Sequence, residues 1–159
     1  MASFLERAGR VLRETKVSDI RDRLLAPHLV EDSMPLEFAL SFFVSKGYEA
    51  LIVVGEGNRV EGIVTLSDIF RALVDVRRRH YLLRRPGIAG GKALVMDVMT
   101  PHPVTVDVGA TLYDAVESML RFGISHLIVT EDGSPVGLLT DRVVIEYLTE
   151  RLGCPRASS

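Results

Sequence analysis

Residues 62–69 read GIVTLSDI, and residues 137–144 read GLLTDRVV. Both segments begin with a glycine, continue through two apolar residues and reach a threonine at the fourth position. A repeat has to be recognised first, because a missed repeat leads to a wrong fold. These two segments therefore predict that the chain holds two copies of one structural unit.

The repetition continues upstream of both segments. An offset of 76 residues pairs Pro27 with Pro103 and Gly47 with Gly123. One additional residue in the loop 55–61 reduces this offset to 75 for the rest of the copy. Matches that stay in register over about 40 residues are not expected by chance, so we treat Pro27 to Thr65 and Pro103 to Thr140 as two tandem copies.

Each copy is predicted to fold as strand, helix, strand, strand and helix. Apolar residues recur at helical spacing, each helical segment ends near a glycine, and short β-branched runs are typical of buried strands. The fold class is therefore α/β (α+β), with two tandem β-α-β-β-α repeats packed as a pseudo-two-fold pair. The expected elements are helices 36–44 and 112–120, strands 51–54, 127–130, 62–64 and 137–139, turns 55–58 and 131–134, and closing helices 68–76 and 141–152.

Composition describes an ordinary globular protein of 159 residues, with 47% hydrophobic and 25% charged residues and a net charge of −2. No apolar run is long enough to span a bilayer, and no signal peptide is visible at the N-terminus. The single Cys154 excludes an internal disulfide and suits a reducing compartment. We therefore expect a cytoplasmic protein without a membrane segment and with no global attraction to nucleic acid.

Outside the repeats, an apolar row in residues 2–15 predicts a helix that packs on the module or across a dimer. A basic and glycine-rich segment separates the two copies. The expected organisation is an N-terminal helix (1–15), a first repeat (16–76), a linker (77–92), a second repeat (93–152) and a flexible tail (153–159).

The ordered pattern of glycine, two apolar residues, threonine and a later aspartate, closing a tandem β-α-β-β-α repeat, resembles a pair of CBS domains, the Bateman module. The resemblance covers roughly residues 16–150 and is to the stand-alone type. It implies a regulatory protein without a covalent cofactor that binds AMP, ADP, ATP or S-adenosylmethionine in the cleft between the repeats. It also implies a homodimer, for which helices 36–44 and 112–120 offer isologous surfaces, and a separately encoded enzyme or transporter as the regulated partner.

The first copy carries polar groups suited to a ribose. Thr65 stands where a strand ends and a helix begins, so its hydroxyl caps the helix or meets a ligand. Asp68 lies in the first turn, where a carboxylate complements the helix dipole or accepts hydrogen bonds from two vicinal ribose hydroxyls. Gly62 and Gly137 permit close approach of another backbone or of a ligand.

The second copy departs from this pattern, because Val143 stands where the first copy has Asp68. A valine leaves a ribose hydroxyl unpaired, so one nucleotide per chain is expected. The resemblance implies that Arg142, which replaces Ser67, and His126 approach the phosphate, and that Val104 forms an apolar floor under the base. His126 is otherwise a structural histidine. The candidate ligand-binding residues are Ile63, Thr65, Ser67, Asp68, Val104, His126 and Arg142.

Two features keep other functions open. Glu49 would repel a polyphosphate, and this repulsion keeps S-adenosylmethionine as an alternative ligand. The other possibility is that Glu49 points to solvent. The basic segment 77–85 offers a nucleic-acid patch, although a solvated helix end is the commoner meaning of such a cluster. The loop 86–92 lacks the spacing of a phosphate-binding loop.

Neither a catalytic constellation nor a metal site is expected. No nucleophile motif is visible, and the four histidines lack the spacing of metal ligands. We therefore expect a protein that is not an enzyme. A structural dimerisation module without a ligand is the remaining alternative.

Overall fold

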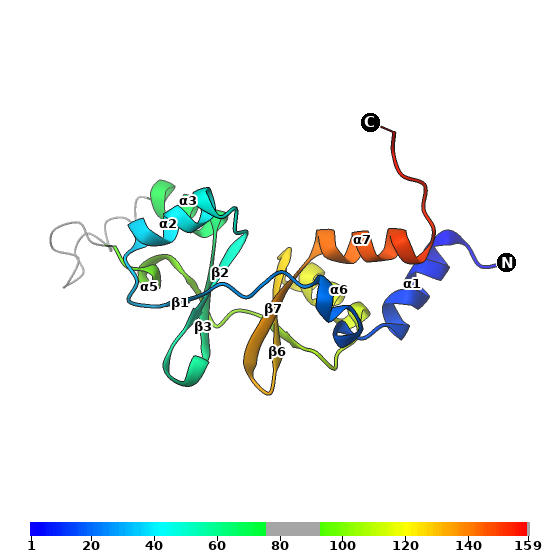
Figure 1. Cartoon of the computed structure of the whole chain (residues 1–159), viewed down its shortest axis with the longest axis horizontal. Coiled ribbons are helices and arrows are strands. Elements are labelled where there is room, and N and C mark those ends of the chain that lie inside the picture. Colours follow the sequence, from blue (N-terminus) through cyan, green and yellow to red (C-terminus); the bar gives the residue numbers. More distant parts are fainter. Residues whose placement is uncertain (76–92, 159) are drawn as a thin grey trace. The chain divides into compact units, whose positions relative to one another are not determined.

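The computed structural model describes residues 1–75 and 93–158. These residues form two compact units (Figure 1). The first-repeat unit is continuous and comprises residues 27–103, whereas the second-repeat unit joins residues 1–26 to residues 104–159. The basic segment 77–85 and the loop 86–92 lie outside the described residues.

The first-repeat unit is a four-stranded sheet with helices on one face. Strand β1 pairs in parallel with β2, β2 pairs antiparallel with β3, and β3 pairs antiparallel with β4. Its elements are β1 (Leu29–Glu31), α2 (Leu36–Ser45), β2 (Ala50–Val54), the short 3-10 turn η2 (Glu56–Asn58), β3 (Val60–Thr65), α3 (Leu66–Val74), α5 (Val95–Val98) and β4 (Thr100–Pro101).

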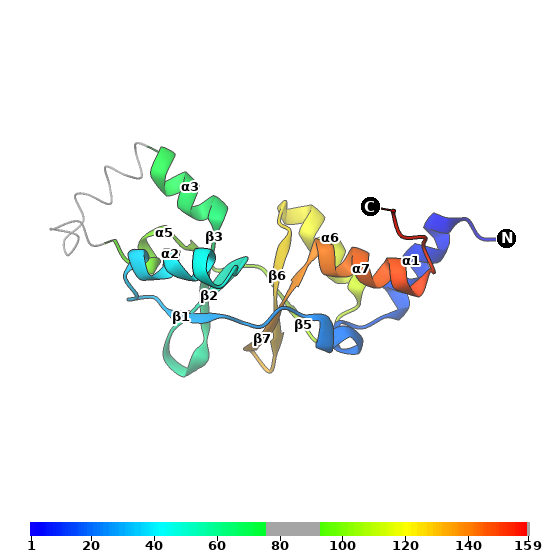
Figure 2. The same ribbon diagram turned by 45° about the horizontal axis from the view of Figure 1, so that its top comes forward.

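One core holds this unit together. Leu51, Val53 and Val64 project from β2 and β3 and pack with Ala39 of α2 and Ile69 of α3. Because alternate strand residues face one side of a sheet, β2 contributes two of them at i and i+2. Figure 2 shows α2, α3 and α5 on the same side of this sheet. The helix α3 is thereby fixed at the end of β3.

The second-repeat unit repeats this plan with three strands in the order β5-β6-β7. Strand β5 is parallel to β6, and β6 is antiparallel to β7. The hairpin between β6 and β7 turns at Asp132 and Gly133, both with positive φ, as its turn residues predict. The elements are α1 (Phe4–Glu14), the 3-10 segment η1 (Val17–Arg23), β5 (Thr105–Asp107), α6 (Leu112–Phe122), β6 (His126–Glu131), β7 (Ser134–Thr140) and α7 (Asp141–Arg151).

Helix α1 covers the predicted amphipathic segment and begins with a capping box in which the Ser3 hydroxyl accepts from the Glu6 amide at 3.2 Å. Leu12 packs against the core of the second-repeat unit. Helix α1 runs beside α6 and α7, as both ribbon views show (Figures 1 and 2). The amphipathic segment therefore packs on the module of its own chain.

The glycine that recurs in both copies has a structural cause in each unit. A Cβ on Gly62 would lie 2.5 Å from Met99 Sδ and 3.0 Å from the Thr100 carbonyl oxygen. A Cβ on Gly137 would lie 2.9 Å from Leu24 Cβ. Another backbone does approach each glycine, as the sequence predicts, because β4 pairs with β3 at Gly62 and Leu25 exchanges two 2.9 Å hydrogen bonds with Leu138.

The segment that crosses each glycine does not belong to the sequence copy in which that glycine lies. Residues 93–103 precede the elements of the second copy but fold into the first-repeat unit. Residues 16–26 precede the elements of the first copy but fold into the second-repeat unit. The compact units therefore differ from the sequence ranges 16–76 and 93–152. The segment that precedes each copy in the sequence packs in the unit formed by the other copy.

Candidate ligand-binding site

The site begins at the N-terminus of α3, where Thr65 is the N-cap residue. The Thr65 hydroxyl accepts a 3.4 Å hydrogen bond from the Asp68 amide, and Asp68 Oδ2 accepts from the Thr65 amide at 2.8 Å. The Thr65 hydroxyl also lies 3.0 Å from Asp68 Oδ2, to which it donates. The predicted capping by Thr65 is therefore confirmed, and the two residues form a reciprocal capping box.

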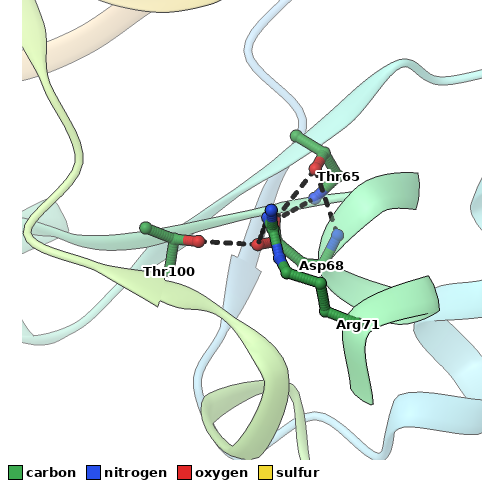
Figure 3. Close-up of polar contacts among 4 residues, drawn as sticks. All are labelled: Thr65, Asp68, Arg71 and Thr100. Atoms are coloured by element: carbon green, nitrogen blue, oxygen red, sulfur yellow. Dashed lines mark hydrogen bonds and ion pairs between the residues drawn. The ribbon is translucent and has the colours of Figure 1, made fainter. Parts of the chain in front are cut away.

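The other carboxylate oxygen of Asp68 has two further donors (Figure 3). Arg71 Nη2 lies 2.8 Å from Oδ1 and forms an ion pair with it. The Thr100 hydroxyl of β4 lies 2.6 Å from the same oxygen. Asp68 is only 2% exposed, so a buried carboxylate is held by donors from both α3 and β4.

These donors keep Asp68 ionised. Burial by itself would raise the pKa of the Asp68 carboxyl. Hydrogen bonds from Thr100, from the Thr65 amide and hydroxyl and from Arg71 outweigh burial and hold this pKa below its ordinary value. The first-repeat unit therefore places a negative charge at the positive end of a helix dipole.

The equivalent position of the second-repeat unit is apolar. The Thr140 hydroxyl caps α7 by accepting from the Val143 amide at 3.2 Å. Val143 is buried in the core of its unit. The second copy thus keeps the threonine cap but replaces the buried charge by a packing residue.

The remaining predicted residues are divided between the units. Ile63 lies on β3 and pairs with Thr100, and Ser67 is exposed on the first turn of α3. Both belong with Thr65 and Asp68 to the first-repeat unit. The structure therefore brings together four of the seven candidates.

The other three candidates lie in the second-repeat unit. Val104 packs against its core, the His126 ring at the start of β6 lies 3.2 Å from the Ser125 hydroxyl, and Arg142 is exposed. Their roles toward a ligand stay predictions. Glu49, which bears on the choice of ligand, is exposed immediately before β2.

Sequence reasoning missed Thr100 and Arg71. Thr100 is 32 positions from Asp68 and precedes the second copy, so no local pattern connects them. Arg71 did carry a signal, because an arginine three residues after an aspartate on a helix is within reach of it. Over the described ranges, the structure contains no group of three or more potential metal ligands. Within the same ranges, no helix has the length and apolar character needed to cross a bilayer.

The family profile of the CBS domain matches residues 17–75 and again residues 95–150. The chain belongs to the CBS-domain family. Two matches in tandem make it a CBS pair, in agreement with the repeat found in the sequence.

Curated relatives of this CBS pair are distant and longer. Inosine-5'-monophosphate dehydrogenase of Nitrosopumilus maritimus is 23% identical over 96% of this chain, which spans 28% of the relative. A 33.4 kDa protein in the ribosomal RNA operon of Thermofilum pendens is 36% identical over 58% of the chain and 31% of its own length. The chain therefore spans about a third or less of either protein.

Solved structures agree with the fold of the CBS pair. CBSX2 in complex with AMP is 26% identical, covers 87% of this chain and 98% of its own, and superposes with a TM-score of 0.70. CBSX2 is also solved from Arabidopsis thaliana, at 25% identity, 89% and 99% coverage and a TM-score of 0.65. The CBS pair of MJ0100, solved with 5'-methylthioadenosine and S-adenosyl-L-methionine, is 22% identical with 86% and 98% coverage and a TM-score of 0.67.

Proposed function

We propose that this CBS pair is a non-catalytic regulatory module that binds an adenosine nucleotide, AMP, ADP or ATP, and signals its level to a partner protein. The observation that carries the proposal is the ionised carboxylate of Asp68 at the start of α3. Two vicinal ribose hydroxyls can donate to such a carboxylate, the arrangement by which acidic residues hold ribose in dinucleotide-binding folds. The complex of CBSX2 with AMP supports this choice of ligand class.

The two repeats contribute differently to this proposal. Asp68 supplies a ribose acceptor in the first-repeat unit, whereas Val143 cannot accept a hydrogen bond and is buried in its core. A ribose placed against Val143 would lose its hydrogen bonds to water without replacement. We therefore propose one nucleotide per chain, with Thr65, Ser67 and Asp68 on the ribose side.

The phosphate and the base would contact residues of the second-repeat unit. Arg142 is exposed on the first turn of α7 and can offer a charge-assisted hydrogen bond to a phosphate. His126 is proposed as a second phosphate neighbour and Val104 as the apolar floor under the base. Ile63, buried on β3, completes the proposed set.

S-adenosylmethionine is the alternative ligand. Glu49 is exposed at the end of the loop before β2, where a carboxylate disfavours a polyphosphate and tolerates a cationic sulfonium. The complex of MJ0100 with S-adenosyl-L-methionine supports testing this ligand beside AMP.

The protein would act through a partner. A ligand shifts a conformational or assembly equilibrium only by its different affinities for the two states. We propose that an enzyme or transporter reads this shift.

Self-association is the second part of the proposal, and it rests on α3. This helix buries Ile69 and Ala72 against the sheet, yet it leaves the adjacent row of Leu66, Phe70 and Leu73 exposed. A helix whose apolar surface is wider than the part covered by its own sheet normally packs against a further partner. A second copy of the chain is the occupant that we propose for the exposed row.

The amount of apolar surface suits a dimer. Phe38 of α2 is 67% exposed and Phe70 of α3 is 62% exposed. An aromatic side chain can bury roughly 150–250 Å², so each ring leaves about 100 Å² or more uncovered. Val44, Leu73 and Val74 are exposed as well, so the two helices add apolar area toward the roughly 800 Å² per partner of a standard interface.

Calorimetric titration with AMP, ADP, ATP and S-adenosylmethionine tests the proposed ligand class. We expect saturable binding near one ligand per chain and a loss of roughly 10- to 100-fold in affinity for Asp68→Ala, because hydrogen bonds to a charged acceptor disappear. Val143→Ala, the matched change in the second repeat, should leave the affinity nearly unchanged. Equal losses in both variants would refute the asymmetry, and absence of heat with every ligand would refute the adenosine proposal.

The phosphate assignment needs a separate comparison. Arg142→Ala and His126→Ala should weaken binding of AMP by about ten-fold and leave binding of adenosine, which has no phosphate, nearly unchanged. A parallel loss for AMP and adenosine would instead assign these residues to the base, to the ribose or to the fold.

A further inference from the structure

The carboxylate of Asp68 has no acceptor position left for a ligand in this structure. Its Oδ2 accepts from the amide and the hydroxyl of Thr65, and its Oδ1 accepts from Arg71 and Thr100. An ionised carboxylate has about four lone-pair positions. A vicinal diol can therefore bind Asp68 only after at least one of these donors has left.

The donors differ in how easily they can leave. The two donors of Thr65 are part of the cap of α3, so their loss would disrupt the helix start. The Arg71 side chain, unlike the buried carboxylate, is 61% exposed, so its guanidinium can turn to solvent and be hydrated there. Thr100 is exposed as well, and its hydroxyl can rotate toward solvent. Figure 3 shows both displaceable donors meeting at Oδ1, the oxygen that does not cap the helix.

The second repeat supports a connection among Asp68, Arg71 and Thr100. At the offset of 75, Asp68 corresponds to Val143 and Arg71 corresponds to Glu146. Thr100 pairs with Ile63, and its counterpart Leu25 pairs with Leu138. Where the acid is absent, neither counterpart can donate a hydrogen bond to this position.

We propose that Arg71 and Thr100 form a displaceable cover on Asp68 Oδ1, and that this cover sets the affinity of the site for ligands that carry a vicinal diol. The inference rests on the proposed adenosine function and adds how the chain's own donors regulate the affinity for the ligand. The Thr100 hydroxyl, at 2.6 Å, makes the contact that a ribose hydroxyl would make. Binding would exchange two intramolecular donors for the two hydroxyls of the ligand, with no change in the charge of Asp68.

A cover of this kind has a consequence for selectivity. Ligand hydroxyls must compete with the chain's own donors, so a ligand that lacks the diol gains nothing from displacing them. The affinity difference between AMP and 2',3'-dideoxy-AMP therefore reports on the cover directly. If Arg71 and Thr100 only stabilise the fold, their removal would not increase the preference of the site for AMP over 2',3'-dideoxy-AMP.

The test compares AMP with 2',3'-dideoxy-AMP in the full chain and its variants. Thr100→Val and Arg71→Met should each raise the affinity for AMP about five-fold, the size expected when one competing hydrogen bond is lost. Neither change should strengthen binding of the dideoxy nucleotide. Thr100→Ser, which retains the hydroxyl, should restore the wild-type affinity, and Glu146→Gln serves as the matched control in the second repeat.

Thermal unfolding of each variant separates a structural loss from an effect on binding. Arg71→Met changes an exposed side chain, so it keeps the test decisive if Thr100→Val weakens the pairing of β4. Binding of AMP that is unchanged or weaker in the folded variants would overturn the cover and leave the adenosine site in place. No binding by any variant would overturn both, whereas binding by the Arg71→Met/Thr100→Val double variant alone would show that the cover masks the site.

Discussion

Asp68 makes four hydrogen bonds through one buried carboxylate, so its chemistry has consequences for stability as well as for binding. Three of the donating groups lie on Thr65 and Thr100, and the fourth is the Arg71 guanidinium. Removal of the carboxylate leaves several of these donors unpaired in a partly buried place. We therefore expect Asp68→Ala to lower the free energy of unfolding by about 1–3 kcal/mol, measured by chemical denaturation.

The stabilisation by Asp68 should depend on pH in a defined direction. Because the pKa of Asp68 is lower in the folded than in the unfolded chain, its contribution is complete above the unfolded pKa of about 3.9. It is lost as the pH falls from there through the folded pKa. The difference in unfolding free energy between the wild type and Asp68→Asn should therefore shrink below about pH 4, and a difference that is constant down to pH 2 would contradict this linkage.

A second pH dependence is expected at His28, whose ring stacks on Tyr48 with 3.2 Å between centroids and 7° between planes. Burial lowers the pKa of His28, so protonation favours the unfolded chain. Stability should be complete above the unfolded pKa of about 6.5 and should fall as the pH drops toward the folded pKa. Unfolding of His28→Phe, which keeps a ring at this position, should lack this component, and NMR titration of the imidazole would measure the folded pKa.

At the level of single residues, the sequence predicted what local spacing controls. Thr65 and Asp68 are three residues apart at a strand-to-helix junction, and their capping box follows from that spacing. The replacement of Asp68 by Val143 was visible from the repeat alone. Thr100 was not predicted, because it reaches Asp68 through the pairing of β4 with β3, and that pairing exchanges segments between copies.

At the level of elements, the edge pairing of β3 depends on the missing side chain of Gly62. An added Cβ would meet Met99 Sδ at 2.5 Å and the Thr100 carbonyl oxygen at 3.0 Å, and the backbone oxygen has little freedom to move. We expect Gly62→Ala to cost about 1–3 kcal/mol of stability and to weaken β4 pairing. The His102 amide donates to the Glu61 carbonyl at 3.1 Å beside this pairing, so its exchange should be faster in the variant, and unchanged or slower exchange would contradict this expectation.

Gly9 in α1 provides the matched control, because its Cβ would make only an ordinary contact with Arg13 Nη1 at 3.5 Å. In a helix interior, alanine is favoured over glycine by roughly 0.5–1 kcal/mol. Gly9→Ala should therefore raise the melting temperature while Gly62→Ala lowers it. Opposite signs from the same chemical change would show that packing against β4 is the cause.

The elements themselves were largely predictable, and their partners were not. Helix α3 was predicted as residues 68–76, after the threonine at the end of the preceding strand, and in the structure it comprises Leu66–Val74. The pairing of Leu25 with Leu138 could not be predicted, since it joins residues from opposite ends of the sequence. Hydrophobic periodicity reports which residues are buried, but it does not identify the strand that lies beside them.

For the whole molecule, the proposed dimer predicts an assembly that depends on α3. Sedimentation equilibrium of the wild type should give twice the mass of the chain. Phe70→Glu should yield monomers, because it places a charge in an apolar interface. Leu120→Glu on α6 changes a leucine that is more exposed than Phe70, on a helix that also carries the exposed ion pair of Glu117 and Arg121, so it should disturb the dimer less.

A monomeric wild type at all concentrations would contradict self-association. Monomers produced by Leu120→Glu but not by Phe70→Glu would place the interface on the second-repeat unit instead. Circular dichroism of each variant would confirm that the exposed substitutions leave the fold intact, as expected for surface positions.

The discontinuous second-repeat unit sets an order of events on the ribosome. Helix α1 and the segment to Ala26 leave the exit tunnel before the first-repeat unit, yet the residues on which they pack, from Val104 onward, are made after it. At about 5–20 residues per second, translation of the intervening first-repeat unit takes roughly 4–15 s. The continuous first-repeat unit can fold during that time, while the apolar row of α1 stays uncovered until α6 and α7 have been made. A nascent chain of this protein would therefore offer helix α1 to chaperones for several seconds before the residues that cover it are made.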